Sequence, residues 1–245
     1  MRLLSALLSV ILLSTGLTPA PRSTAQSEPV QTSPAIVIGF VGGFIKHDDM
    51  VHSEVQLGAL LRAEYATGVH VQVFGNHHGD DAFNEILRLL DVNGDGKLSA
   101  EEKSDARIVI YGHSWGGSET VALARRLQKD AIPVLLTVQV DSVQKPREDD
   151  STIPANVEQA VNFYQTDGLV HGRQHIRAEN AERTQILGNF RISYQTKAPV
   201  CQGYPWFASL FEKAHIEIEC DPNVWNQVGA LIRARLPQRF ESHGS

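Results

Sequence analysis

The sequence predicts an α/β fold in which a mostly parallel β-sheet carries helices on both faces. Apolar runs of strand length recur along the chain, at 35–41, 69–74, 107–111 and 133–140. Segments whose apolar residues have helical spacing alternate with them, at 50–65, 81–90, 119–128 and 221–236. Because parallel strands need crossover connections, this alternation places helices against the two faces of one sheet.

Each strand has a local signal. The run 35–41 is apolar along most of its length and ends in Gly42-Gly43, which is typical of a buried parallel strand that enters a loop. The segment 69–74 alternates apolar and polar residues and stops at a glycine. A shorter strand is expected at 161–164, after the segment 156–160.

The helices have signals of their own. Segment 81–90 is amphipathic, with its apolar residues on one side: Phe83, Ile86, Leu87 and Leu90. Asp221 and Pro222 begin the last helix, which runs to Leu236, because aspartate caps a helix and proline suits its first turn.

Composition limits the possible functions. The chain has 245 residues, of which 42% are hydrophobic and 20% charged, and these proportions suit one domain with a sizeable core. Its net charge of −6, without any basic run, argues against nucleic acid as a partner, because phosphate binding needs a basic surface.

The first 25 residues predict a secretory signal. Met1-Arg2 precedes the apolar stretch 3–17, and Ser23-Thr24-Ala25 offers a cleavage site, with Thr18-Pro19-Ala20 as an alternative. The apolar core is short for a bilayer span, so no stable membrane span is expected after cleavage, although an uncleaved anchor stays open. We expect export to the periplasm or the outside of the cell. A flexible lead-in at 26–34, one domain at 35–238 and a tail at 239–245 would follow.

The two cysteines, Cys201 and Cys220, are candidates for a disulfide. In an oxidising compartment an isolated pair with this spacing fits a bridge, and two buried thiols are the alternative.

The most informative segment is Gly112-His113-Ser114-Trp115-Gly116, which follows an apolar strand and precedes a helix. This context is that of a nucleophile elbow, a sharp turn that exposes a serine hydroxyl above the end of a sheet. Gly112 and Gly116 remove the Cβ atoms that would clash across such a turn. Ser114 is therefore the candidate nucleophile, and an ordinary strand-to-helix turn is the alternative.

A serine nucleophile needs a base and an orienting acid, which follow it in the order acid, then histidine. Asp141 follows the strand 133–140 and is the favoured acid, with Asp167 as its rival. His215 lies in the expected loop before the last helix and is the favoured base, ahead of two histidines in a polar segment, His171 and His175. We expect His113, inside the elbow, to point elsewhere. A disulfide would hold the loop that carries His215.

Together these residues make 35–236 resemble the α/β-hydrolase superfamily, in its lipase- and esterase-like branch. The resemblance implies acyl transfer through a serine ester, with the backbone N–H groups of Trp115 and Gly43 as oxyanion donors. In many lipases and esterases the first oxyanion strand ends in His-Gly. The segment 39–43 lacks that histidine, which leaves the second donor open.

A calcium-binding motif lies within 81–104, before the nucleophile strand. The segment 91–102 matches D-x-[DN]-x-[DN]-G-x5-E at every fixed position. Its ligands would be Asp91, Asn93, Asp95, the carbonyl of Lys97, Ser99 and Glu102. The segment resembles one EF-hand loop with its entering helix, inserted into the α/β domain. It predicts one structural Ca²⁺, and an acidic surface turn is the alternative.

The leading hypothesis is an exported serine hydrolase that cleaves a carboxylic or lipid ester and holds a structural calcium ion. The alternative is a non-catalytic, secreted calcium-binding protein on a hydrolase-like scaffold, since a fold does not fix a function. Cleavage of peptides or polyesters by the same triad is not distinguished by the sequence.

Overall fold

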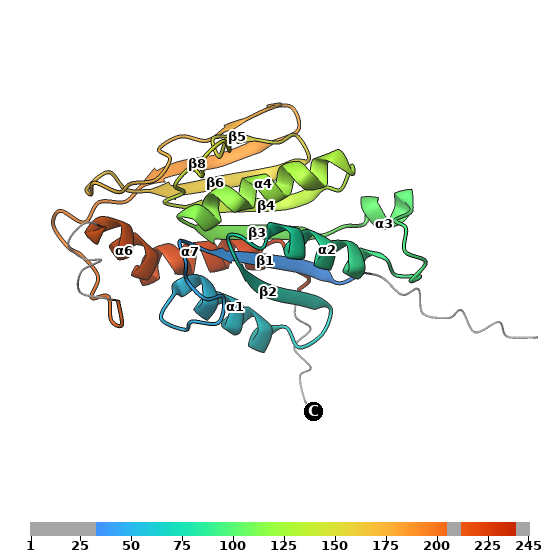
Figure 1. Cartoon of the computed structure of the whole chain (residues 1–245), viewed down its shortest axis with the longest axis horizontal. Helices are drawn as coiled ribbons and strands as arrows, with labels where there is room; N and C mark the ends of the chain where they lie inside the picture. Colours follow the sequence, from blue (N-terminus) through green and yellow to red (C-terminus); the bar gives the residue numbers. More distant parts are fainter. Residues whose placement is uncertain (1–32, 205–211, 239–245) are drawn as a thin grey trace, which may run out of the picture. The chain divides into compact units, whose positions relative to one another are not determined.

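The computed structural model describes residues 33–204 and 212–238, and it confirms the predicted α/β fold class (Figure 1). The main sheet has six strands in the order β2-β1-β3-β4-β6-β8, and every neighbouring pair is parallel. Its strands are β1 (Ala35–Val41), β2 (Val69–Gly75), β3 (Ile108–His113), β4 (Val134–Val140), β6 (Val157–Tyr164) and β8 (Gln185–Arg191). A small separate sheet pairs β5 (Thr152–Ile153) with β7 (Arg177–Ala178).

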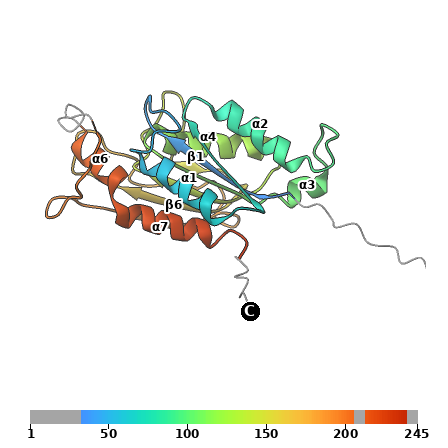
Figure 2. The ribbon, with the colours of Figure 1, turned by 90° about the horizontal axis from the view of Figure 1, so that it is seen from below.

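Helices connect the strands and cover both faces of the main sheet (Figure 2). They are α1 (Ser53–Glu64), α2 (Gly79–Leu90), α3 (Ala100–Ser104), α4 (Trp115–Lys129), α6 (Lys213–Cys220) and α7 (Pro222–Arg233). None of the helices in the described part of the chain is long and apolar enough to cross a membrane. The predicted signal at 1–25 and the tail at 239–245 lie outside the described residues, as does most of the lead-in.

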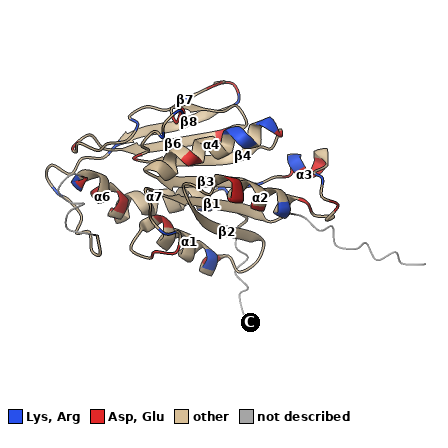
Figure 3. Cartoon of the chain, viewed as in Figure 1, with Lys and Arg blue, Asp and Glu red and all other residues tan. Residues whose placement is uncertain are grey.

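Two apolar cores lie on opposite faces of the sheet, because successive strand residues point to opposite faces. On one face, Ile36 and Ile38 of β1 pack with apolar residues of α2 and α4. On the other face, Val37 packs with apolar residues of α1 and α7. Charged residues are concentrated on the helices and connecting loops, whereas the strands are largely uncharged (Figure 3).

The strand order places a crevice at the carboxyl end of the sheet. From β1 the chain passes to β2 on one side, and β3 then pairs on the opposite side of β1. The connections that leave β1 and β3 therefore diverge, which is where open α/β sheets bind ligands. The loop after Val41 and the elbow after His113 both lie at this point.

Three expectations about the second half of the chain were wrong or incomplete. Strand β6 begins at Val157 rather than at 161, and β8 was not predicted. Its sequence is interrupted by Gly188 and Asn189, and it is a partly exposed edge strand without the apolar run of a central one. His215 lies in helix α6 and not in a loop.

Candidate active site

Ser114 occupies a strained turn between strand and helix. Strand β3 ends at His113 and α4 begins at Trp115, so Ser114 alone makes the turn, with φ 56° and ψ −126°. A Cβ atom on Gly112 would lie 2.4 Å from the carbonyl oxygen of Gly116, and one on Gly116 would lie 2.3 Å from that of Phe40. Both positions therefore require glycine, and the left-handed serine stores strain of the kind found at functional sites.

Asp141 lies at the carboxyl end of β4, fully buried, and its carboxylate accepts several hydrogen bonds. Three of the donors belong to the segment after β6: Gln165 Nε2 at 2.8 Å, Gln165 N at 3.2 Å and Gly172 N at 2.8 Å. Burial alone would raise the pKa of Asp141, but hydrogen bonds and the charge of His215, with those from Gln165, bring it below its ordinary value. The acid is therefore ionised at neutral pH.

His215 completes this arrangement from a distant part of the sequence. Its Nδ1 lies 2.6 Å from Asp141 Oδ2, and both side chains are buried. A disulfide between Cys201 and Cys220 joins the end of α6 to the segment before it, as the sequence predicted. The bridge therefore restrains the element that carries His215.

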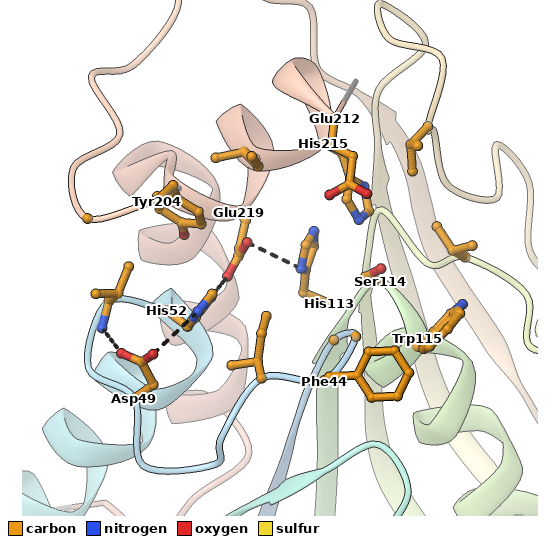
Figure 4. A pocket seen from close by; sticks show the side chains of 18 residues that line it. Phe44, Asp49, His52, His113, Ser114, Trp115, Tyr204, Glu212, His215 and Glu219 are labelled. Atoms are coloured by element: carbon orange, nitrogen blue, oxygen red, sulfur yellow. Dashed lines mark hydrogen bonds and ion pairs between the residues drawn. The ribbon is translucent and has the colours of Figure 1, made fainter. Parts of the chain in front are cut away.

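Ser114 and His215 line one cavity of about 650 Å³ (Figure 4). Within the described part of the chain, Ser114 Oγ makes no hydrogen bond. Catalytic hydrogen bonds are often long without substrate and tighten when it binds. The serine is partly exposed to this cavity, so a substrate can reach its hydroxyl.

The two residues predicted to supply oxyanion donors, Trp115 and Gly43, line the same cavity as Ser114. Trp115 is the first residue of α4, so its N–H has no acceptor within the helix. The turn of Gly42 and Gly43 lines the same cavity. Buried Asn76 donates to the carbonyls of Val41 and Gly43 and so fixes the orientation of that turn.

The rival residues lie apart from this arrangement. Asp167 accepts hydrogen bonds from Ser193 Oγ and Tyr194 N, both at 2.8 Å, so its carboxylate belongs to the connection after β8. His175 packs against the ring of Tyr164, and His171 Nδ1 lies 3.4 Å from the carbonyl of Gly172.

His113 does not point away from the site, contrary to expectation. Its ring centroid lies 4.5 Å from that of His215, and the side chain lines the cavity. Burial lowers the pKa of His113 to about 4, despite the nearby carboxylate of Glu219, so the imidazole is neutral at pH 7. The elbow therefore contributes His113 to the cavity as well as Ser114 and Trp115.

Aromatic side chains gather where the cavity opens. Phe44 is 88% exposed, although it is a large apolar residue. Its ring stacks on His77 at 5.7 Å and meets Trp115 edge-on at 5.8 Å. An exposed aromatic group beside a pocket is typical of a surface that contacts an apolar ligand.

The predicted calcium loop lies between α2 and α3, as expected. Ser99 caps α3 in a capping box with Glu102, whose carboxylate accepts from Ser99 N and Val92 N at 2.9 Å each. Asp91 accepts from Asp95 N and Gly96 N. The loop's own N–H groups thus hold its carboxylates. Of the described residues, only His52, Glu54 and Glu219 form a group of three His, Cys, Asp or Glu whose donor atoms all lie within 4.8 Å of one another.

Sequence reasoning missed two residues that support the site. Asn76 follows β2 directly, and Gln165 follows β6 directly, so both lie at the carboxyl edge of the sheet. A polar residue immediately after a strand was the available signal, since ligand and catalytic groups gather at that edge.

Comparisons with known proteins show only distant likeness. No family model matches the chain, and no curated protein matches it in sequence. An arylesterase structure has a TM-score of 0.44 at 13% identity, covering 85% of this chain and 78% of that one. Human thioesterase 2 gives 0.41 at 9%, covering 84% and 100%. A cutinase-like protein from Cryptococcus gives 0.42 at 12%, covering 83% and 97%. Likenesses this distant assign no activity, which has to rest on the site itself.

Proposed function

We propose that the protein is an exported serine hydrolase that cleaves carboxylic or lipid esters. Ser114 is the nucleophile, His215 the general base and Asp141 the acid that orients it. The observation that carries the proposal is the 2.6 Å contact between His215 and the buried, ionised Asp141, next to a strained serine in the same cavity. A tight turn with a structural role alone would not need that pair.

The reaction follows from these positions. Asp141 accepts a hydrogen bond from the Nδ1–H of His215, which leaves Nε2 unprotonated as the base that takes the proton of Ser114 Oγ. The oxygen attacks the ester carbonyl, and the new C–O bond leaves negative charge on the carbonyl oxygen. The N–H groups of Trp115 and Gly43 stabilise that charge. The imidazolium then gives its proton to the leaving-group oxygen as the ester C–O bond breaks, which releases the alcohol and leaves the acyl group on Ser114. Water, deprotonated by His215, attacks this acyl group in the same way and releases the acid from Ser114.

The walls of the cavity favour an ester with an apolar part. Much of the lining is apolar, from Ile45, Val51, Val143, Val170 and Ile216. Exposed Phe44 extends this surface outward toward Trp115. Burial of apolar substrate surface there strengthens binding by about 25 cal/mol of free energy per Å². Tyr204 also lines the cavity.

Two further elements belong to the proposal. Export is supported by the signal-like segment 1–25 and by the disulfide, because disulfides persist in oxidising compartments. A structural calcium ion is supported by the loop chemistry: Asp91, Asn93, Asp95, Ser99 and Glu102, with the carbonyl of Lys97, supply the oxygen ligands that Ca²⁺ prefers. For full coordination, Glu102 would have to turn from its capping bonds toward the ion.

Labelling with a fluorophosphonate tests the nucleophile without knowledge of the substrate. We expect covalent labelling of the wild-type protein and none of Ser114→Ala. Ser193→Ala, which changes an exposed serine, is the matched control and should be labelled like the wild type. Absence of labelling in folded, calcium-saturated protein would instead support a non-catalytic calcium-binding protein.

A further inference from the structure

A second group of polar side chains is buried beside the proposed triad. His52 immediately precedes α1, Glu54 lies in the first turn of that helix and Glu219 lies near the end of α6. Figure 4 shows Glu219 between His52 and His113, on the far side of His113 from Ser114. The proposed reaction uses none of these four residues.

Two members of this group lack partners although they are buried. Glu54 is fully buried, and neither of its carboxylate oxygens makes a hydrogen bond to the described residues. His113 is 2% exposed, and neither ring nitrogen makes one. Buried polar groups without partners are rare in native proteins, because nothing compensates for their loss of hydration. The unpartnered atoms of Glu54 and His113 are close to each other, so one ligand between them would satisfy both side chains.

The spacing of the donor atoms suits one ion. His52, Glu54 and Glu219 each offer a ligand atom, and these atoms lie within 4.8 Å of one another. His113 Nδ1 lies 3.6 Å from Glu54 Oε1 and 3.8 Å from Glu219 Oε2. Tetrahedral zinc with ligands at about 2.0–2.1 Å separates them by roughly 3.4 Å. Small movements would therefore close the group around an ion.

The charges also call for a cation. Glu54 and Glu219 are both buried, and among the described residues their ion-pair partners are histidines only, without lysine or arginine. A divalent cation that displaces the proton of Glu54 would neutralise both carboxylates. The outer contact of His52 fits as well, because its Nε2 faces Asp49 at 3.9 Å, and metal-bound histidines commonly place a carboxylate at the other nitrogen.

We propose that His52, Glu54 and Glu219 bind one divalent metal ion of the zinc type, with His113 as a fourth donor. Mixed imidazole and carboxylate ligands favour zinc over calcium, which prefers an all-oxygen shell. His52 and Glu219 line the cavity, so the ion has a route from solvent. The ion would join α1 and α6 to the end of β3. It would therefore fix the position of α6, the helix that carries the proposed base His215.

Zinc binding is measured on the mature chain after removal of metals, in millimolar Ca²⁺ so that the loop at 91–102 is saturated. Zinc content by mass spectrometry and affinity by calorimetry are compared for wild type, His52→Ala and Glu219→Gln. We expect one zinc ion per chain in the wild type, with a dissociation constant raised on the order of 100-fold or more in both variants.

Two variants control for zinc bound elsewhere in the same cavity. Glu212→Gln changes another carboxylate that lines the cavity, and His215→Ala removes the imidazole beside Asp141. Both should keep one tightly bound zinc ion. The proposal would be overturned if the wild type failed to bind zinc, or if His215→Ala lost it. Wild-type zinc affinity in His52→Ala and Glu219→Gln would also overturn it.

X-ray absorption of the zinc-loaded wild type keeps the test independent of how the variants fold. We expect about four nitrogen and oxygen ligands at 2.0–2.1 Å, with imidazole scattering from one or two histidines. A six-coordinate shell without imidazole would contradict the site. Because none of these measurements needs turnover, the outcome is separate from that of the serine-hydrolase proposal.

Discussion

Two fully buried carboxylates near the carboxyl edge of the sheet have opposite surroundings. Asp141 accepts from Gln165, Gly172 and His215, whereas Glu54 accepts no hydrogen bond from the described residues. Both are 0% exposed. Burial is therefore equal, and the difference lies in the donors that the fold supplies.

The pKa values follow these surroundings. Burial and the nearby carboxylate of Glu219 raise the pKa of Glu54 well above its ordinary value. For Asp141 burial acts in the same direction, but the hydrogen bonds outweigh it and the pKa falls. Desolvation thus fixes the protonation of a buried acid only where donors are missing. The comparison explains why Asp141 stays ionised and can orient a histidine, whereas Glu54 favours its protonated form.

Replacement of Asp141 has the largest expected effect. In Asp141→Asn the amide cannot hold His215 in the tautomer that leaves Nε2 free, so kcat should fall by about 10⁴-fold. Asp167→Asn is the matched control, because Asp167 bonds to Ser193 and Tyr194 instead. Its kcat should stay within a few-fold of wild type. Ester hydrolysis measured with a chromogenic short-chain ester checks both variants, and equal losses would contradict the assignment of the acid.

Removal of a donor to Asp141 has a smaller effect. Gln165→Leu deletes the 2.8 Å hydrogen bond to Asp141 and leaves a buried carboxylate with fewer partners. The free energy of unfolding should fall by about 2 kcal/mol, as for other buried groups that lose a partner. Urea denaturation measures the change. Gln195→Leu, which removes an exposed hydrogen bond to Asp167, should cost much less. A loss of stability in Gln165→Leu as small as that in Gln195→Leu would show that the side-chain donor to Asp141 contributes little.

The pH dependence of stability tests the lowered pKa of Asp141. A group with a lower pKa in the folded state contributes stability above its unfolded value, here 3.8, and loses it as pH falls through the folded value. The free energy of unfolding should therefore fall more steeply below pH 4 in the wild type than in Asp141→Asn. Denaturation series between pH 2 and pH 6 compare the slopes. Parallel slopes would mean that Asp141 titrates alike in both states.

Local patterns predicted the parts of the fold that depend on nearby residues. The strand 35–41, the elbow and the Asp221-Pro222 helix start each have a signal within a few residues, and each agrees with the structure. Strand β8 had no such signal, because an edge strand needs less apolar sequence than a central one. Its place comes from pairing with β6, which a single sequence does not show.

The site was predictable to the extent that residues follow strands directly. Asp141 follows β4, and the order of residues along the chain pointed to His215. The contact between His113 and His215 was not predictable, because it depends on where α6 packs. The same holds for Glu54 and Glu219, which are 165 residues apart and come together only in the fold. A glutamate in each of two distant helices gives no sign in the sequence that the two side chains will lie close together.

Glu102 extends the comparison to an exposed acid, and here we expect the smallest effect. Backbone hydrogen bonds from Ser99 and Val92 lower the pKa of Glu102, so its carboxylate is charged. A calcium ion could replace those N–H groups as its partner. Millimolar Ca²⁺ should raise the Tm of the wild type by about 3 °C, because binding to the folded state alone stabilises it. Glu102→Gln, which keeps the size of the side chain but loses a charged ligand, should abolish that gain. Glu101→Gln alters the neighbouring exposed acid, which occupies a position of the motif that supplies no ligand, and should keep the gain. If calcium shifts no Tm in either wild type or Glu101→Gln, the loop at 91–102 is an acidic surface turn held by its own N–H groups.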